Sequence, residues 1–318
     1  MIFRLLAAIL IALCAGGAES QQAYPNKPIK LISPFPPGGP SDLIARLLGE
    51  KLHAALRQPL VVDHRQGAAG NVGVEIVAKS PPDGYTLLMT IDTPLTVNPS
   101  LYPNMPFKPD ELRPVTLVAS SSLMFVAHPK LGVASVAEFL AKAKEREITF
   151  SSAGNGSPGH VATAMLTEKT GAGISNIFYK GNTPATLAIV SGEVEAAIIA
   201  TPGLLPHVKS GRIKALAVTS AKRSPLAPEV PTTAEAGLEG VAFEVLYLLM
   251  APSGTPPAII ATLQKEIAAA LALPDVQEKL RNADLSIIGE TGAAVDARLA
   301  QARERYATTI KRTGMKIE

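Results

Sequence analysis

Residues 29–56 read IKLISPFPPGGPSDLIARLLGEKLHAAL, and this stretch decides the fold. Ile29 to Ser33 is a short apolar run typical of a buried strand. A loop follows, Pro36-Pro37-Gly38-Gly39-Pro40-Ser41-Asp42, and apolar residues then recur at helical spacing from Asp42 to Leu56. Serine is a good N-cap and proline fits the first helical turn, where no N–H is needed. The stretch therefore predicts a strand, a tight loop and a helix of an α/β sheet.

The same junction recurs along the chain, at Thr93-Pro94, Gly154-Asn155-Gly156-Ser157-Pro158, Gly181-Asn182-Thr183-Pro184 and Thr201-Pro202. The free N–H groups of a helix start and the helix dipole together bind an anion without a basic side chain. Glycines let the backbone approach a ligand closely. One such junction only starts a helix, but their repetition in both halves of the chain predicts a binding site.

Strands and helices alternate along most of the chain, which predicts parallel sheets covered on both faces. We expect strands at 29–33, 60–63, 85–91, 115–127, 148–151, 177–179, 194–200, 213–219 and 243–251. We expect helices at 42–56, 70–79, 136–144, 161–170, 184–191, 257–271 and 294–312.

The two longest expected strands, 115–127 and 243–251, are the best places for the chain to pass between lobes. We expect lobe 1 to comprise residues 24–123 and 246–318, and lobe 2 residues 124–245. The predicted fold class is α/β, with two doubly wound lobes and a hinge of two crossing strands. Ligands bind at the carboxyl ends of strands in such sheets, so both sets of junctions would face one cleft.

The candidate ligand-binding residues come from these junctions and the strand ends before them. They are Phe35, Pro36, Gly38, Gly39, Ser41, Asp42, Thr90, Asp92, Thr93, Ser152, Gly154, Asn155, Ser157, Gly181, Asn182, Thr183 and Pro184. Charge is scarce in these loops, with Asp42, Asp92 and Lys180 as the exceptions. Asp42 is equally well placed as a helix-start charge, and Lys180 as a solvent-exposed side chain.

Composition excludes several classes of protein. The 318 residues are 47% hydrophobic and 18% charged, with a formal net charge of +3, which fits a two-domain globular protein. There is no block of Lys or Arg and no Trp, so nucleic acid is not an expected partner. The five histidines are scattered without metal spacing, and no phosphate-binding loop occurs, so we expect no cofactor or metal. The glycines of 67–73 have the wrong spacing for a dinucleotide loop and predict a strand-to-helix turn.

The N-terminus has the pattern of a secretion signal over residues 1–20. Met1 to Arg4 is positive, Leu5 to Leu13 is apolar, and small residues offer cleavage near Ala18 or Ser20. Cys14 raises lipid attachment as an alternative, but Leu13 stands where such sites usually have Gly or Ala. Removal of Cys14 leaves a mature chain without cysteine, which suits an oxidising compartment. We therefore expect a soluble periplasmic protein.

Signals for an enzyme are weak. Gly156-Ser157-Pro158-Gly159 is similar to a nucleophile elbow, but Gly-x-Ser-x-Gly would need Gly at position 155, where Asn155 stands. A hydrolase using Ser157 stays open as the less favoured alternative, with no catalytic residue assigned.

Six stretches together resemble one family: PNKPIKLISPFPPGGPSDLIAR, PPDGYTLLM, NPSLY, YKGNTPA, KALAVTSAKRSPLAPEVPTTAEAG and APSGTPP. They are similar, in order and spacing, to the Bug family, the extracytoplasmic (TctC-like) receptors of tripartite tricarboxylate transporters. The resemblance runs from about Tyr24 to the C-terminus. It implies a two-lobed flytrap similar to type II periplasmic binding proteins, with a small organic acid between the lobes.

The resemblance also implies delivery of the acid to a membrane permease with one large and one small subunit. We expect the receptor itself to be a monomer. A sensory partner of a membrane kinase would use the same site and remains an alternative. The chain departs from the family pattern at Ala188, where Asp is common, at Ile199-Ala200, where an acidic or amide pair is common, and near Leu246, where Trp is common. These departures favour a mono- or dicarboxylate with an apolar middle over an amino acid.

Overall fold

The computed structural model describes residues 24–317, so the expected signal peptide and Cys14 lie outside the described residues. The first strand, loop and helix agree with the prediction from the sequence. Strand β1 (Ile29–Ser33) is almost fully buried, and helix α2 (Pro40–Leu56) follows the Pro/Gly loop. Helix α2 begins two residues before the predicted start because Pro40 occupies its first turn, where the missing N–H costs nothing.

Lobe 1 is built on a sheet whose order is β2–β1–β3–β9. The first three strands are parallel, and β9 runs antiparallel to β3. The bounds are β2 (Leu60–His64), β3 (Thr86–Ile91) and β9 (Glu244–Pro252). Helices of this lobe are α2, α3 (Asn71–Ala78), α4 (Thr93–Thr96), α5 (Asn98–Leu101), α10 (Pro257–Leu271) and α11 (Pro274–Asn282). The predicted turn at 67–73 is confirmed, since β2 ends at His64 and α3 begins at Asn71.

Lobe 2 repeats the arrangement with the order β4–β7–β5–β6, in which β7, β5 and β6 are parallel. Its strands are β4 (Leu112–Ala127), β5 (Ile148–Ser152), β6 (Ile174–Phe178), β7 (Ala196–Ala200) and β8 (Lys214–Val218). Its helices are α6 (Val136–Glu145), α7 (Pro158–Thr170), α8 (Asn182–Ser191) and α9 (Leu205–Lys209). Phe125, Phe139 and Phe150 pack edge to face or tilted in its core, with ring centroids 4.8–5.8 Å apart.

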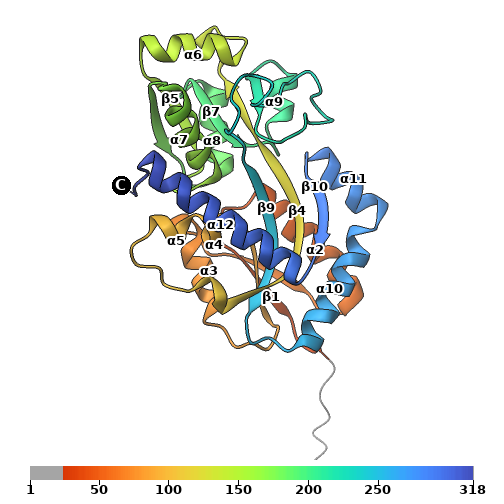
Figure 1. Ribbon diagram of the computed structural model, residues 1–318. Coiled ribbons are helices and arrows are strands. Elements are labelled where there is room, and N and C mark those ends of the chain that lie inside the picture. Colours follow the sequence, from red (N-terminus) through yellow and green to blue (C-terminus); the bar gives the residue numbers. More distant parts are fainter. Residues whose placement is uncertain (1–23, 318) are drawn as a thin grey trace, which may run out of the picture.

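Strands β4 and β9 connect the lobes, and Figure 1 shows them side by side through the centre of the molecule. Strand β4 pairs with β9 from Leu112 to Ser122, and with β7 and β8 from Leu123 to Ala127. Strand β4 thus changes its pairing partner between Ser122 and Leu123. The hinge of two crossing strands is confirmed, while the exact lobe boundaries stay a prediction.

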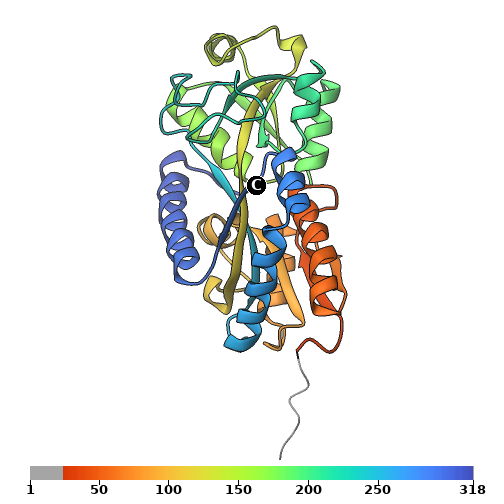
Figure 2. The ribbon, with the colours of Figure 1, turned by 90° about the vertical axis from the view of Figure 1, so that its right-hand side faces the viewer.

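The C-terminal helix α12 (Ala293–Thr313) lies along the side of the hinge and reaches both lobes (Figure 2, deep blue). Arg303 Nε donates to the carbonyl of Leu95 in lobe 1 at 3.0 Å. Arg312 Nε lies 2.6 Å from Glu168 Oε1 in lobe 2. Phe243 stacks on Tyr306, with centroids 4.8 Å apart. This helix therefore braces the hinge from one side.

Several elements differ from the sequence predictions. The sheets are parallel only in part, because β9 and β10 (Ser286–Glu290) both run antiparallel to β4. Strand β10 and helix α11 were not predicted. Strand β10 is half exposed and contains Gly289, so its apolar alternation is weak. Thr201-Pro202 opens a turn, and the following helix α9 starts only at Leu205.

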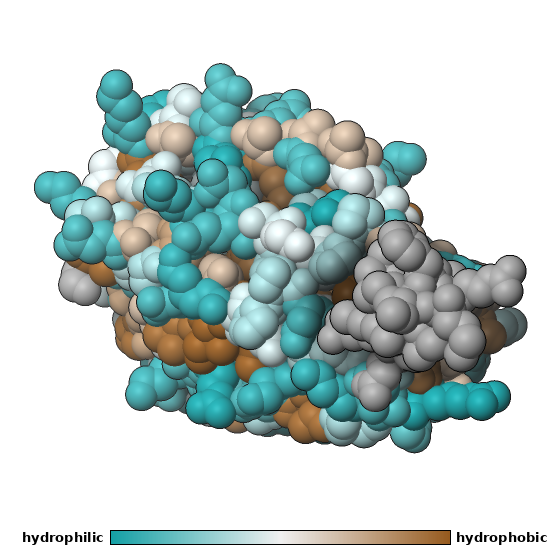
Figure 3. Space-filling model, turned by 90° about the horizontal axis from the view of Figure 1, so that it is seen from below, coloured by the Kyte–Doolittle hydropathy of each residue, from teal (hydrophilic) through white to brown (hydrophobic). Residues whose placement is uncertain are grey.

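The end of lobe 1, seen from below, is a mosaic of hydrophilic and apolar side chains (Figure 3). Exposed apolar side chains of lobe 1 include Val61, Val72 and Ile76. From residue 24 to residue 317, no helix has both the length and the apolar character needed to span a bilayer.

Candidate functional site

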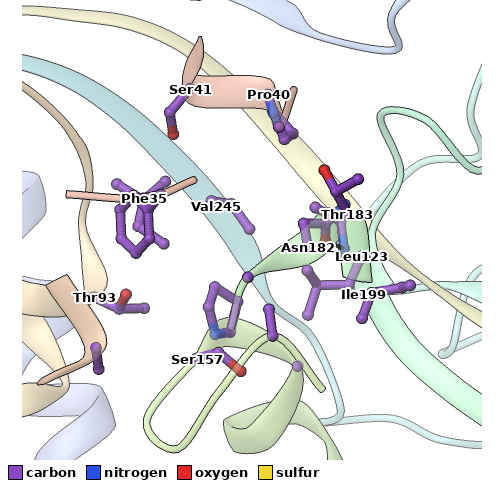
Figure 4. A pocket seen from close by; sticks show the side chains of 18 of the residues that line it. Phe35, Pro40, Ser41, Thr93, Leu123, Ser157, Asn182, Thr183, Ile199 and Val245 are labelled. Carbon is purple, nitrogen blue, oxygen red and sulfur yellow. Dashed lines mark hydrogen bonds between the residues drawn. The ribbon is translucent and has the colours of Figure 1, made fainter. Parts of the chain in front are cut away.

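A cavity lies between the lobes, against the two hinge strands (Figure 4). It holds about 740 Å³ of empty space, part of which is open to solvent. Both lobes and the hinge supply its wall, which consists of Phe35, Pro36, Gly39, Pro40, Ser41, Ala69, Ile91, Thr93, Leu123, Ala153, Asn155, Ser157, Pro158, Gly159, Gly181, Asn182, Thr183, Ile199, Ala200, Val245 and Tyr247. None of these residues carries a charged side chain.

On the lobe 1 side, the wall is the start of α2 and the loop before it. The N-cap of α2 is Gly39, whose missing side chain leaves the first N–H groups without a side-chain acceptor. Asp42, the third residue of the helix, turns back and accepts a hydrogen bond from the Gly38 N–H at 2.9 Å. The predicted serine cap is thus wrong here, because Asp42 organises the loop while Ser41 lines the cavity.

Two side chains, Arg46 and His64, lie beside the Asp42 carboxylate. Arg46 Nε donates to Asp42 Oδ2 at 2.9 Å, and His64 Nε2 lies 3.2 Å from Asp42 Oδ1. The other ring nitrogen of His64 lies 2.8 Å from the carbonyl oxygen of Phe35, which can only accept. Burial alone would raise the pKa of Asp42, but the hydrogen bonds from Arg46 and the Gly38 N–H outweigh it and lower the pKa. The lobe 1 loop is therefore held by an ionised carboxylate.

On the lobe 2 side, the start of α7 is held by neutral groups. Ser157 is its N-cap, and the hydroxyl accepts a hydrogen bond from the His160 N–H at 3.3 Å, as the sequence predicts. The His160 ring accepts at Nδ1 from the Gly156 N–H at 3.1 Å and contacts Phe178 edge to face. Burial lowers the pKa of His160 to about 4, so the ring is neutral near pH 7.

Helix α8 presents a further N-terminus to the cavity. Its N-cap is Gly181, at φ +112°, and not the predicted Thr183. Asn182 Oδ1 accepts from the Ala200 N–H at 3.2 Å and so fastens the helix start to the end of β7. Thr183 and Asn182 both line the cavity.

The remaining wall is apolar. Leu123, Val245 and Ile199 lie between the polar helix starts (Figure 4). Tyr247 also lines the cavity, and its buried hydroxyl is 3.0 Å from Ser121 Oγ, which joins the two hinge strands. Asn155 Oδ1 is buried in the wall without a hydrogen-bond partner among the described residues. This oxygen is therefore available to a hydrogen-bond donor in the cavity.

Of the candidate residues, the structure brings together Phe35, Pro36, Gly39, Ser41, Thr93, Asn155, Ser157, Gly181, Asn182 and Thr183 in the cavity wall. Gly38, Asp42, Thr90, Asp92, Ser152, Gly154 and Pro184 are not among the lining residues. Gly38 and Asp42 shape the lobe 1 loop, and Thr90 Oγ1 donates to the carbonyl of Ile91 at 3.0 Å.

Asp92 points away from the cavity. Its Oδ1 accepts from the Leu246 N–H at 3.1 Å, and its own N–H donates to the Leu246 carbonyl at 3.0 Å. Asp92 and Leu246 both border a groove beside α12, on the face of the hinge opposite the cavity. Burial raises the pKa of Asp92 to about 7, and the hydrogen bonds from Leu246 and Thr96 only partly offset this.

Sequence reasoning missed the hinge residues Leu123, Val245 and Tyr247, and also Ala69. Strand alternation could have placed Val245 and Tyr247 on one face of β9, but not which face. Ala69 has a left-handed backbone at φ 51°, and the glycine-rich run around it was the available signal. Of the three departures, Ile199-Ala200 lines the cavity, Ala188 is buried outside its wall, and Leu246 faces the α12 groove.

The fold and cavity define a two-lobed solute-binding protein, with helix N-termini at an uncharged site between the lobes. A family model described as "Tripartite tricarboxylate transporter family receptor" matches residues 44–315, and the chain belongs to this family. It is 38% identical to Protein BugT of Bordetella pertussis over 322 residues, which covers 99% of both chains.

Solved structures are similar to this chain along most of its length. A structure described as "R. palustris Rpa4515 with adipate" has a TM-score of 0.88 and 31% sequence identity, covering 92% of this chain and 99% of that one. MatC (Rpa3494) from Rhodopseudomonas palustris with bound malate has a TM-score of 0.84 and 26% identity, covering 90% and 100%. No group of three or more metal-ligating side chains occurs within residues 24–317.

Proposed function

We propose that this protein is a periplasmic receptor that captures a small organic carboxylate between its lobes. It delivers the acid to a tripartite tricarboxylate-type permease with a large and a small subunit. The observation that carries the proposal is the meeting of the α2, α7 and α8 N-termini at one cavity that has no charged lining residue. Free N–H groups and helix dipoles offset the desolvation of a carboxylate without a basic side chain.

The proposed ligand class is based on the apolar side chains between the polar groups of the cavity wall. Leu123, Ile199 and Val245 favour a mono- or dicarboxylate with an apolar middle. No carboxylate lines the cavity, so the ammonium of an amino acid would have no charged partner. The adipate in the Rpa4515 structure has this chemistry, whereas malate adds a hydroxyl.

Ligand contacts are proposed for the polar lining groups. These are the side chains of Ser41, Thr93, Asn155, Asn182 and Thr183, and the backbone at Gly39, Ser157 and Gly181. Phe35 and Pro36 would cover the apolar part of the acid. Ordered water can complete the hydrogen bonding.

The binding test is a thermal-shift and calorimetric panel of succinate, adipate and malate, with aspartate as the amino-acid comparison. An acid at about 100 times its dissociation constant stabilises the protein by roughly 2.7 kcal/mol. Adipate is expected to give the largest shift and aspartate none. A panel without any shift, on protein that carries no bound acid, would contradict the proposal.

A charge introduced at the N-cap of α7 tests the location. Asp and Asn both cap helices well, so Ser157→Asp and Ser157→Asn form a matched pair. Ser157→Asp is expected to abolish adipate binding by placing a negative charge in the cavity, while Ser157→Asn retains most of it. Equal binding by both variants would move the carboxylate site elsewhere.

A serine hydrolase has less support. Ser157 Oγ accepts from the His160 backbone N–H, and the His160 ring accepts from the Gly156 N–H, so both groups serve the loop. Ester or amide turnover that disappears in Ser157→Ala would favour the hydrolase. A sensory role would use the same cavity, and co-purification with a membrane kinase instead of a permease would favour it.

A further inference from the structure

The lobes touch in the cavity wall at the start of α8. A Cβ atom added to Gly181 would lie 2.5 Å from Pro36 Cγ and 2.9 Å from Pro36 Cδ. Gly181 belongs to lobe 2 and Pro36 to lobe 1, so this is a contact between lobes. Carbon atoms in contact are normally about 3.5–4.0 Å apart, and only a residue without a side chain permits such an approach.

A second contact lies at the loop before α7. A Cβ added to Gly156 would be 3.1 Å from Asn98 Oδ1 and 3.3 Å from Leu101 Cδ1, both in lobe 1. Asn98 is held in place by a 2.7 Å hydrogen bond to Asn71 Oδ1, so it has little freedom to yield. The contact at Gly156 is therefore tight, although less so than the contact at Gly181.

A third approach is looser. A Cβ at Gly38 would lie 3.8 Å from Thr183 Oγ1 across the cleft, which is an ordinary contact distance. The lobes thus meet in this structure at more than one point. The fit excludes a methyl group at Gly181 and leaves little room for one at Gly156.

We infer that Gly181 and Gly156 are positioning residues that set how far the two lobes close. The inference rests on the proposed function, because closure matters here as the step that surrounds the bound acid. A methyl group at Gly181 would press on Pro36 and hold the lobes apart. The acid would then be less completely enclosed, and its dissociation would be faster.

Backbone strain must be separated from the contact. Gly181 has φ +112° and Gly156 has φ +79°, so alanine is strained at either position even without a neighbour. Gly240, also in lobe 2, has φ +89° and nothing within 4 Å of an added Cβ. Gly240→Ala is therefore the control for strain alone. Pro36→Ala removes Cγ and Cδ, and relieves the contact without relieving the strain.

Closure can be measured without a ligand by a disulfide across the cleft. Gly38→Cys and Thr183→Cys would place two thiols on opposite sides of the cleft, because a Cβ at Gly38 lies 3.8 Å from Thr183 Oγ1. Gly38 has φ +82°, so the strain of this cysteine is common to every variant that is compared. Cys14 is the only natural cysteine, and Cys14→Ser removes it. With copper phenanthroline as oxidant, the rate of disulfide formation reports the population of the closed form.

In this background we expect Gly181→Ala to slow disulfide formation by about tenfold, within the range of couplings between contacting residues. Gly156→Ala should slow it less, and Gly240→Ala should leave it unchanged. The double variant Pro36→Ala/Gly181→Ala should recover most of the rate of Pro36→Ala.

An unchanged rate in Gly181→Ala would overturn the inference. So would an equal slowing in Gly240→Ala, or a double variant without recovery. These outcomes do not depend on adipate. A failure of every acid to bind would refute the proposed function and leave the closure measurement intact.

Discussion

The two loops that face each other across the cavity are stabilised in different ways, one by an ionised carboxylate and the other by neutral groups. In lobe 1, the loop before α2 is held by ionised Asp42, with Arg46 and His64 around it. In lobe 2, the loop before α7 is held by the Ser157 hydroxyl and the neutral ring of His160. Each support leaves backbone N–H groups free to meet an anion. The difference teaches that the two walls of one site can respond to different ranges of pH.

The largest expected effect is that of replacing Asp42 in the lobe 1 loop. Asp42→Ala would leave the Gly38 N–H and the Arg46 guanidinium without their acceptor, and should lower the free energy of unfolding by about 3 kcal/mol. Adipate binding should be lost with the loop. Urea denaturation and calorimetry measure both. Asp42→Asn, which keeps an acceptor for Gly38, should do less damage. Arg46→Gln, on the exposed partner, should change little.

The lobe 2 loop, which is held by His160, is expected to lose stability at a higher pH than the lobe 1 loop. The pKa of His160 is lowered to about 4, so the unfolded chain binds a proton before the folded one does as pH falls below about 6.5. Roughly 2 kcal/mol of stability should be lost between pH 6.5 and 4. His160→Asn keeps an acceptor near Gly156 and should remove this slope. Stability curves that keep the slope in His160→Asn would refute the assignment.

Asp42 should act only in stronger acid. Its lowered pKa means that its contribution is present above the ordinary pKa of aspartate and is lost as pH falls through the lower, folded value. Hydrogen exchange, corrected for intrinsic rates, should show residues 153–160 opening by pH 5 while residues 35–42 stay protected. Simultaneous opening of both loops would contradict the comparison.

Behind the hinge, Asp92 has the reverse dependence. Its pKa is raised to about 7, so the stability that it contributes is complete in acid and is lost as pH rises through 7. Asp92→Asn keeps an oxygen for the Leu246 N–H without the buried charge. At pH 8 this variant should be more stable than the natural protein, and at pH 4 equally stable. Thermal unfolding at the two pH values provides the check.

The smallest effect is expected at the cap of α7. Ser157→Ala removes the acceptor for the His160 N–H and should cost about 1 kcal/mol, the usual value of an N-cap. Its pH profile should match that of the natural protein, because the hydroxyl does not titrate. A changed profile would mean that Ser157 and His160 interact more closely than two separate supports of one loop.

Much of the fold could be predicted because its signals are local. Pro40, Pro158 and Pro257 lie at helix starts, and alternating strands and helices lead to two α/β lobes. Strand β10 could not be predicted, because its stability comes from pairing with β4 rather than from its own residues. The polar junctions at Ser41, Ser157 and Thr183 were also visible, since a capped helix start is a short-range pattern.

The sequence by itself determined the βα units, the helix starts that form most of the polar wall, and membership of the receptor family. Only the tertiary structure decided that Asp92 faces the back of the hinge, that Leu123, Val245 and Tyr247 line the cavity, and that Gly181 touches Pro36. The physical reason is distance along the chain. Strand registers and contacts between lobes depend on how β4 and β9 pass each other, and no local pattern contains that geometry.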